Sequence, residues 1–147
     1  MTEADRLIAV AEKEVGYVEK SRSAYDRYGK DILYFPQLYA GSDNYTKYNY
    51  EMHQISPDVM DFPAAWCDAF VDWCFLTAFG RRAAEHALHG RFDDYTQNSA
   101  SLYIRDGAMS TTPERGRQVF FTKNQTFAGI HHTGIVTAVD ETYIYTI

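Results

Sequence analysis

Apolar residues recur at helical spacing near the start of the chain. A first helix is predicted after the acidic start at residues 2–5, with Gly16 as its stop, on the positions Leu7, Ile8, Ala11 and Val15. A second short helix is expected over residues 25–28. Residues 29–63 are rich in Tyr, Asn, Asp, Gly and Pro, and we interpret them as a long ordered loop region that can include helical turns.

The clearest helix is predicted over residues 65–79, and Gly80 is its expected cap. Its apolar face is formed by Phe70, Val71, Cys74 and Ala78. Another helix is expected over residues 98–106.

After residue 106 the spacing of apolar residues changes from the helical period to the alternation of strands. Strands are predicted at residues 118–121 and 132–139, followed by a two-residue turn at 140–141 and a return strand at 142–147. Helices followed by an antiparallel hairpin indicate an α+β fold, with N-terminal helices packed on an antiparallel β-sheet.

Composition supports one folded domain with a real core. The chain has 147 residues, of which 46% are hydrophobic and 16% aromatic. The net charge is −6 and no Lys/Arg run is present, so we expect no nucleic-acid partner. No apolar run approaches the ~20 residues of a membrane span. The first residues lack the basic start and apolar stretch of a signal peptide. The sequence does not indicate an oligomeric state.

The two cysteines, Cys67 and Cys74, are expected to be thiols. Seven residues apart on one helix, they would lie about 10 Å apart along its axis, whereas a disulfide needs Cα atoms within roughly 7 Å. Cys67 falls at the start of the helix, where free N–H groups favour a thiolate. Cys74 falls on the apolar face and should be inert. The alternative for Cys67 is a small buried hydrophobic residue.

A cysteine hydrolase also needs a histidine base and a group that orients it. His131 and His132 open the predicted strand at residues 132–139. If residues 140–141 form a two-residue turn, Val139 pairs with Thr142. His132 would then face a position about two residues beyond Ile147.

Metal binding is the competing use of these residue types. The spacing of the cysteines and histidines does not match a zinc pattern. Asp43 and Asn44 are not part of a spaced calcium-binding run. We therefore expect no metal and no cofactor.

Four segments resemble, in order, the sequence blocks of CHAP domains (cysteine, histidine-dependent amidohydrolases/peptidases). Residues 66–74, WCDAFVDWC, resemble the W-C-x-x-F-V-x-W-C block, and residues 132–136, HTGIV, resemble the H-x-G-I-V strand. Residues 113–121 are similar to P-x-x-G-D-x-V-F-F, and residues 44–48 to an N-Y-T-K-Y stretch. The segment from Glu14 to Lys20 fits the end of the family's first helix. The resemblance covers nearly the whole chain.

This resemblance implies a papain-like CHAP fold and a cysteine-dependent peptidoglycan hydrolase. Such an enzyme is an N-acetylmuramoyl-L-alanine amidase or an endopeptidase that cuts cell-wall peptides through a thioester. It acts at the cell wall, outside the cell, in bacterial or phage-derived proteins. The resemblance assigns Cys67 as nucleophile and His132 as base. By strand alternation His132 shares a face with Gly134, while His131 points the other way.

The sequence departs from the family in two places. Arg117 stands where the family often has Asp. The family's third catalytic residue, typically Glu within an E-G-N run, would fall just after Ile147. We therefore expect residues 1–147 to be a single CHAP-like catalytic domain that is truncated at its C-terminus. Asp140 and Glu141 are poor substitutes, because eight strand residues separate His132 from Asp140 by about 26 Å.

Substrate contacts are expected from the Tyr- and Asn-rich segment and from the start of the central helix, at Asn44, Tyr45, Tyr48 and Trp66. Aromatic side chains with polar tips suit muropeptides. The alternative is that these tyrosines pack the loop onto the core. Two rival functions stay open: a non-catalytic cell-wall or peptide-binding module on the same fold, and a papain-like enzyme that acts on other peptides.

Overall fold

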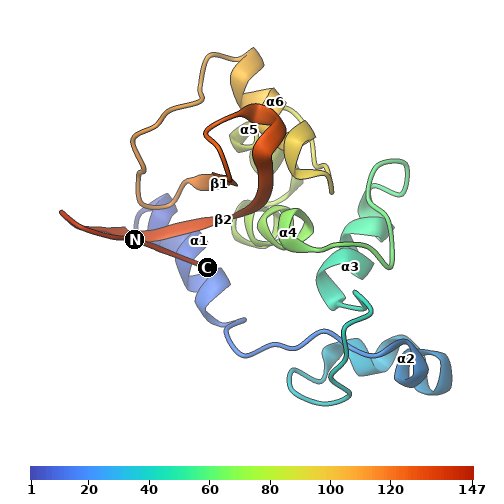
Figure 1. Ribbon diagram of the computed structural model, residues 1–147. Coiled ribbons are helices and arrows are strands. Elements are labelled where there is room, and N and C mark those ends of the chain that lie inside the picture. The colour runs from blue at the N-terminus through green and yellow to red at the C-terminus, as the bar shows by residue number, and fades with distance from the viewer.

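Six α-helices and a three-stranded antiparallel sheet form the computed structural model, which describes residues 1–147 (Figure 1). The helices are α1 (Glu3–Glu12), α2 (Arg22–Tyr28), α3 (Lys47–Ile55), α4 (Cys67–Phe79), α5 (Arg81–Ala87) and α6 (Thr96–Arg105). Two 3₁₀ turns are η1 (Lys30–Tyr34) and η2 (Phe127–Gly129). The strands are β1 (Gln118–Thr122), β2 (Ile130–Val139) and β3 (Ile144–Thr146). The predicted α+β class is confirmed.

Helix α4 is the centre of the molecule. Helices α1, α3, α5 and α6 and strand β2 all pack against it, as Figure 1 shows for the green helix. Most of its residues are therefore buried: Asp68, Ala69, Phe70, Val71, Asp72, Trp73, Cys74, Phe75 and Ala78. A helix that is covered on several sides gains most of its stability from this packing rather than from helix propensity.

The predicted start of α1 is confirmed by a capping box. The Thr2 side chain accepts from the Asp5 N–H, and the Asp5 carboxylate accepts from the Thr2 N–H. The helix ends at Glu12, earlier than expected, and a turn follows in which Gly16 has a φ of +95°. That left-handed conformation suits glycine.

The segment at residues 29–63 is more ordered than a loop. It contains η1 and the nine-residue helix α3, which begins at a capping box between Thr46 and Asn49. Helix α5 was also not predicted. Both α3 and α5 carry many polar residues, and their buried side chains are few. The hydrophobic pattern is therefore weak, and packing against α4 determines these helices.

Strand β2 lies between β1 and β3. The predicted pairing of Val139 with Thr142 is wrong, because Val139 pairs with Ile144. The turn is wider than two residues: the Asp140 N–H donates to the Tyr143 carbonyl at 3.0 Å. The Asp140 carboxylate in turn accepts from the N–H groups of Thr142 and Tyr143 at 2.7 Å each. Such Asx geometry favours a longer turn.

A shift in register between Val136 and Ala138 brings the end of the chain beside Gly134. Ile135 and Ile147 exchange two backbone hydrogen bonds, of 2.7 and 3.0 Å. A Cβ atom at Gly134 would lie 2.7 Å from the Ile147 carbonyl oxygen. Glycine is therefore required at position 134 for this close approach. None of the helices has the length and apolar character needed to cross a membrane.

Candidate active site

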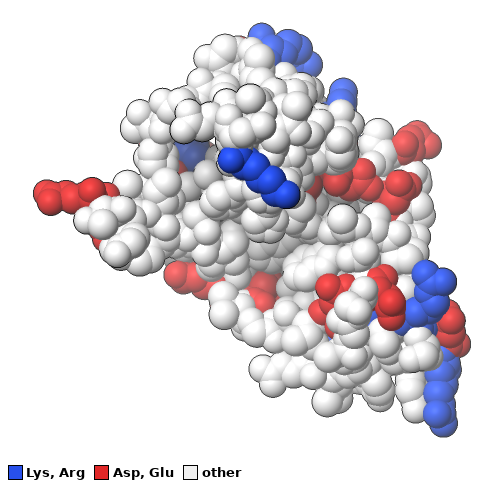
Figure 2. All heavy atoms as spheres, viewed as in Figure 1, with Lys and Arg blue, Asp and Glu red and all other residues white.

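A pocket of about 430 Å³ opens where α4 begins, between the turn after α1, helix α3 and strand β2. It is lined mainly by aromatic and aliphatic side chains. The lining residues are Glu14, Val15, Tyr17, Asn44, Tyr48, Ala65, Trp66, Cys67, Phe70, His132, Thr133 and Ile147. Cys67 and His132, 65 positions apart in the sequence, thus border the same cavity. On the face drawn in Figure 2, Lys and Arg side chains are scattered and form no continuous stripe.

Cys67 is the first residue of α4 and is half-buried. The preceding residue, Trp66, provides no side-chain cap, so the first N–H groups of the helix are not satisfied by a capping side chain. Their partial positive charge favours an anionic sulfur or an oxyanion at this position. The Cys67 Sγ lies 3.6 Å from the Thr96 Oγ1, at the first residue of α6.

His132 lies on β2, and its ring stacks on Phe121, its cross-strand partner, with 5.5 Å between centroids. His131 does not line the pocket, and its Nδ1 contacts the Gly129 carbonyl at 3.3 Å. Strand alternation therefore separates the two histidines as expected. No hydrogen bond joins His132 to Cys67. In free enzymes such catalytic contacts are often longer than in the complex with substrate.

Cys74 is completely buried in the hydrophobic core. Burial raises the pKa of the Cys74 thiol well above its ordinary value, because the thiolate would lose its hydration. Both cysteines are free, so the prediction that they form no disulfide is confirmed. Cys74 has the features of an inert core residue.

The residues expected to contact substrate divide into two groups. Trp66, Tyr48 and Asn44 line the pocket, and the rings of Tyr48 and Trp66 stack at 5.6 Å. Tyr45 does not line it. Its buried ring packs on Tyr25 at 4.6 Å and on Phe62 at 5.5 Å. For Tyr45, therefore, the structure matches the alternative interpretation, in which the tyrosine packs the loop onto the core.

A family model, described as CHAP domain, matches residues 58–147 of the chain. The match includes α4 with Cys67 and the whole sheet with His132. This chain belongs to the CHAP domain family. CHAP domains are generally hydrolases that act on the peptidoglycan of cell walls, which gives the class of activity. No curated protein and no solved structure matches the chain.

Arg117, at which this CHAP domain differs from the Asp that the family often has, lies on the surface. The Arg117 side chain is largely exposed and its Nε lies 3.5 Å from the Glu114 Oε2. It does not border the pocket. The arginine therefore changes a surface charge and leaves the lining of the pocket as it is.

A buried polar network in the CHAP domain connects the neighbours of Cys67 and His132, and sequence reasoning missed it. Asp68 accepts hydrogen bonds from the Ser99 hydroxyl and from the Gln118 amide, the latter at 3.1 Å. The same Gln118 amide donates to the Thr133 hydroxyl at 3.0 Å. The only signal in the sequence was the presence of two carboxylates, Asp68 and Asp72, in a mainly apolar helix.

Burial raises the pKa of Asp68 from 3.8 to about 7, although hydrogen bonds from Ser99 and Gln118 oppose this rise. One turn further along α4, burial and the nearby Asp68 charge raise the pKa of Asp72 well above its ordinary value. Despite these acidic groups, the structure contains no cluster of three or more His, Cys, Asp or Glu side chains arranged to hold a metal ion.

Proposed function

We propose that this CHAP domain is a cysteine-dependent peptidoglycan hydrolase, an N-acetylmuramoyl-L-alanine amidase or an endopeptidase. Cys67 is the nucleophile and His132 is the base. The observation that supports this assignment is that Cys67, at the uncapped start of α4, and His132, on β2, border one largely apolar pocket. Of the two cysteines and the two adjacent histidines, only this cysteine and this histidine do so.

In the proposed reaction His132 takes the proton from the Cys67 thiol, and the sulfur attacks an amide carbonyl of the wall peptide. The carbonyl oxygen becomes an oxyanion, which the backbone N–H of Cys67 stabilises at the helix start. His132 then gives its proton to the leaving amine as the C–N bond breaks, and a thioester to Cys67 remains. Water attacks this thioester while His132 takes up a proton of the water. The C–S bond then breaks, the acid product leaves, and His132 returns the proton to the Cys67 sulfur.

The pocket offers contacts for a peptide besides the reacting groups. Trp66 provides aromatic surface and stacks on the buried ring of Tyr48, and the Asn44 side-chain amide forms no hydrogen bond within the protein although it borders the cavity. A free amide can pair with the donors and acceptors of a peptide backbone. We include Asn44 and Trp66 in the proposed substrate site, and the buried Tyr48 supports the Trp66 ring from behind.

A non-catalytic wall-binding module is the second candidate. It is favoured by one observation, the lack of a hydrogen bond between His132 and either Cys67 or a carboxylate. An imidazole that nothing orients can adopt the wrong tautomer, which lowers the rate by orders of magnitude.

The test compares wall hydrolysis by the wild type with that by two matched pairs of variants. Cys67→Ala and His132→Gln should each abolish the release of soluble wall fragments, while Cys74→Ala and His131→Gln retain it. Mass spectrometry of the fragments identifies the bond that is cut. If the Cys67→Ala variant still hydrolyses walls, the assignment is wrong. If the wild type binds walls but releases nothing, the binding module is the better description.

A further inference from the structure

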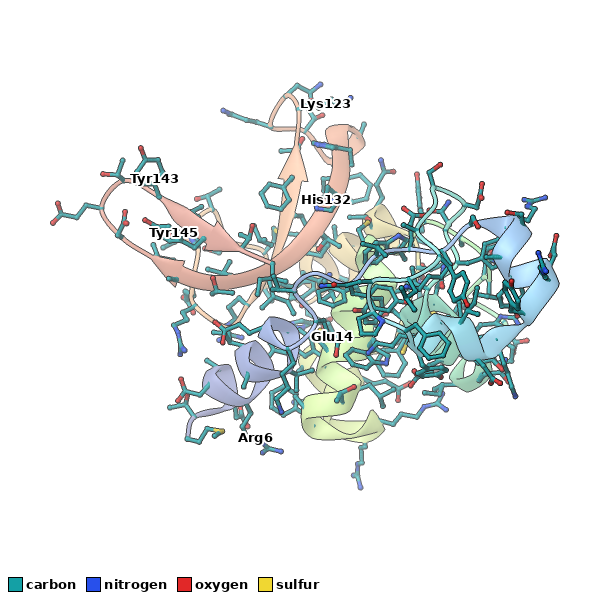
Figure 3. All side chains as sticks on the ribbon, turned by 90° about the horizontal axis from the view of Figure 1, so that it is seen from below. Arg6, Glu14, Lys123, His132, Tyr143 and Tyr145 are labelled. Carbon is teal, nitrogen blue, oxygen red and sulfur yellow. The ribbon has the colours of Figure 1, made fainter.

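Cys67 has a polar neighbour that is not part of the pocket lining. The Thr96 Oγ1 lies 3.6 Å from the Cys67 Sγ, a distance at which a hydroxyl and a sulfur can form a hydrogen bond. Thr96 is only 8% exposed and does not border the pocket. His132 borders it and lies toward the middle of the molecule in Figure 3, whereas Tyr143 and Tyr145 lie on the projecting hairpin. Thr96 therefore reaches the sulfur from the protein interior, away from the cavity that Cys67 and His132 share.

Cys67 is the single hydrogen-bond partner of the buried Thr96 hydroxyl. While Cys67 is a thiol, either group can be the donor. A thiolate can only accept, so ionisation of Cys67 fixes the Thr96 hydroxyl as the donor. A hydrogen bond to a charged acceptor is stronger than one between two neutral groups. The contact therefore favours the thiolate over the thiol.

The position of Thr96 is fixed by bonds that do not involve its own hydroxyl. Ser99, one turn further along α6, donates to the Asp68 carboxylate at the start of α4. The Asp93 N–H, in the segment before α6, donates to the Asp72 Oδ2 at 2.9 Å. The starts of the two helices are thus joined on both sides of the contact with the sulfur. The Thr96 hydroxyl can be removed while these bonds remain.

Both helices also begin without a side-chain cap, so free N–H groups of two helix starts add partial positive charge near the contact. His132 forms no hydrogen bond with Cys67, so it does not take over the role of the hydroxyl.

We propose that Thr96 is a further catalytic residue, whose hydroxyl donates a hydrogen bond to the Cys67 thiolate and stabilises it before substrate binds. This inference rests on the proposed function in that Cys67 is the nucleophile. The hydroxyl acts on the sulfur directly, whereas His132 acts from the side of the pocket. Thr96 itself has no contact with the substrate, because it does not border the cavity.

The experiment follows the alkylation of Cys67 by iodoacetamide in the full chain over a range of pH and determines the pH of half-maximal rate. Since the thiolate is the reacting form, this midpoint reports its formation. In Thr96→Val the midpoint should rise by about one pH unit, and the rate well below it should fall about tenfold, as expected for the loss of one hydrogen bond to a charged group. Thr96→Ser retains the hydroxyl and should restore the wild-type midpoint.

A matched control is Thr142→Val, the same change on the exposed hairpin turn, which should leave the midpoint unchanged. Thr96→Ala is a second variant without the hydroxyl, and it replaces Thr96→Val if that protein does not fold. Circular dichroism and the protection of Cys74 from alkylation establish folding. Every variant retains the ionisable side chains around the contact, so the differences report the hydroxyl. These side chains are Glu14, Asp68, Asp72, Asp93, Asp94 and His132.

A higher midpoint without the hydroxyl, reversed in Thr96→Ser, is the result that supports the proposal. An unchanged midpoint in a folded variant without the hydroxyl, or an equal rise in Thr96→Ser, overturns it. Wall hydrolysis is measured separately. If the wild type releases no wall fragments while the midpoints change as expected, the proposed function fails and the hydrogen bond from Thr96 to the thiolate stands.

Discussion

The buried carboxylate of Asp68 should make the stability of the protein depend on pH in a defined direction. In the unfolded chain its pKa is near 3.8, and in the folded protein burial raises the pKa to about 7. Below about pH 4 Asp68 is protonated in both states and does not affect the pH dependence. As the pH rises from 4 to 7 the unfolded chain loses the proton while the folded protein retains it. The folded state binds more protons, so its stability falls over this range.

The magnitude follows from the size of the shift. One pKa unit is about 1.4 kcal/mol, so a rise from 3.8 to about 7 corresponds to about 4 kcal/mol lost between pH 4 and pH 7. Asp68→Asn removes the titrating group. The asparagine amide can donate to the Ser99 hydroxyl while its oxygen accepts from Gln118, so the geometry of the site can be kept.

Urea unfolding between pH 4 and pH 7.5, followed by the fluorescence of Trp66 and Trp73, measures the effect. Near pH 4 the variant should be about as stable as the wild type or less stable, and near pH 7 it should gain about 4 kcal/mol relative to it. Glu141→Gln, on the exposed hairpin turn, is the control and should follow the wild type within about 0.5 kcal/mol. Parallel curves for Asp68→Asn and the wild type would show that Asp68 titrates normally and refute the reasoning.

Three further substitutions or treatments test other parts of the structure. Iodoacetamide should label Cys67 in the native protein, whereas Cys74 should react only after unfolding. Peptide mass mapping identifies the labelled cysteine, and rapid labelling of Cys74 in the native protein would contradict its burial. Gly134→Ala should lower the free energy of unfolding by about 1–3 kcal/mol, because its Cβ would meet the Ile147 carbonyl; an unchanged urea midpoint would show that β3 moves aside freely. Asn49→Ala removes the side-chain bonds of 2.7 Å to the carbonyls of Asn44 and Ala64 and also those from the Thr46 N–H and hydroxyl, so it should cost about 2–3 kcal/mol in urea unfolding. Gln54→Ala, on the exposed side of α3, should cost less than about 0.5 kcal/mol.

The parts of the fold with a strong local pattern could be predicted from the sequence. The apolar run of α4, the Thr2 cap and the alternation in β2 are local properties, so they indicated the α+β class and the separation of Cys67 from Cys74. Helix α3 could not be predicted in this way. Its apolar residues Tyr48, Met52 and Ile55 do recur at helical spacing, but over only two turns and within a segment rich in polar residues. Residues far away in the sequence cover them, so the local pattern alone was too short to predict the helix.

The sequence was enough to select the two central residues of the candidate site, but not the residues around them. Cys67 and His132 stood out by residue type and by position on their elements. The environment of Asp68 depends on what packs around its carboxylate, namely Ser99 and Gln118, which lie far from it in the sequence. The hairpin register failed for a similar reason, because the Asp140 side chain selects a longer turn than the spacing of apolar residues suggested.

The pocket is built from residues that range from Glu14 to Ile147. During synthesis on the ribosome, α1, α3 and α4 are made before the strands that complete the wall of the pocket. A nascent chain can therefore hold Cys67 on its helix while His132 is still absent from the site. If the proposed pair is correct, the ability to attack amide bonds arises only after β2 has been translated, so shorter products that lack β2 would not carry this hydrolytic activity.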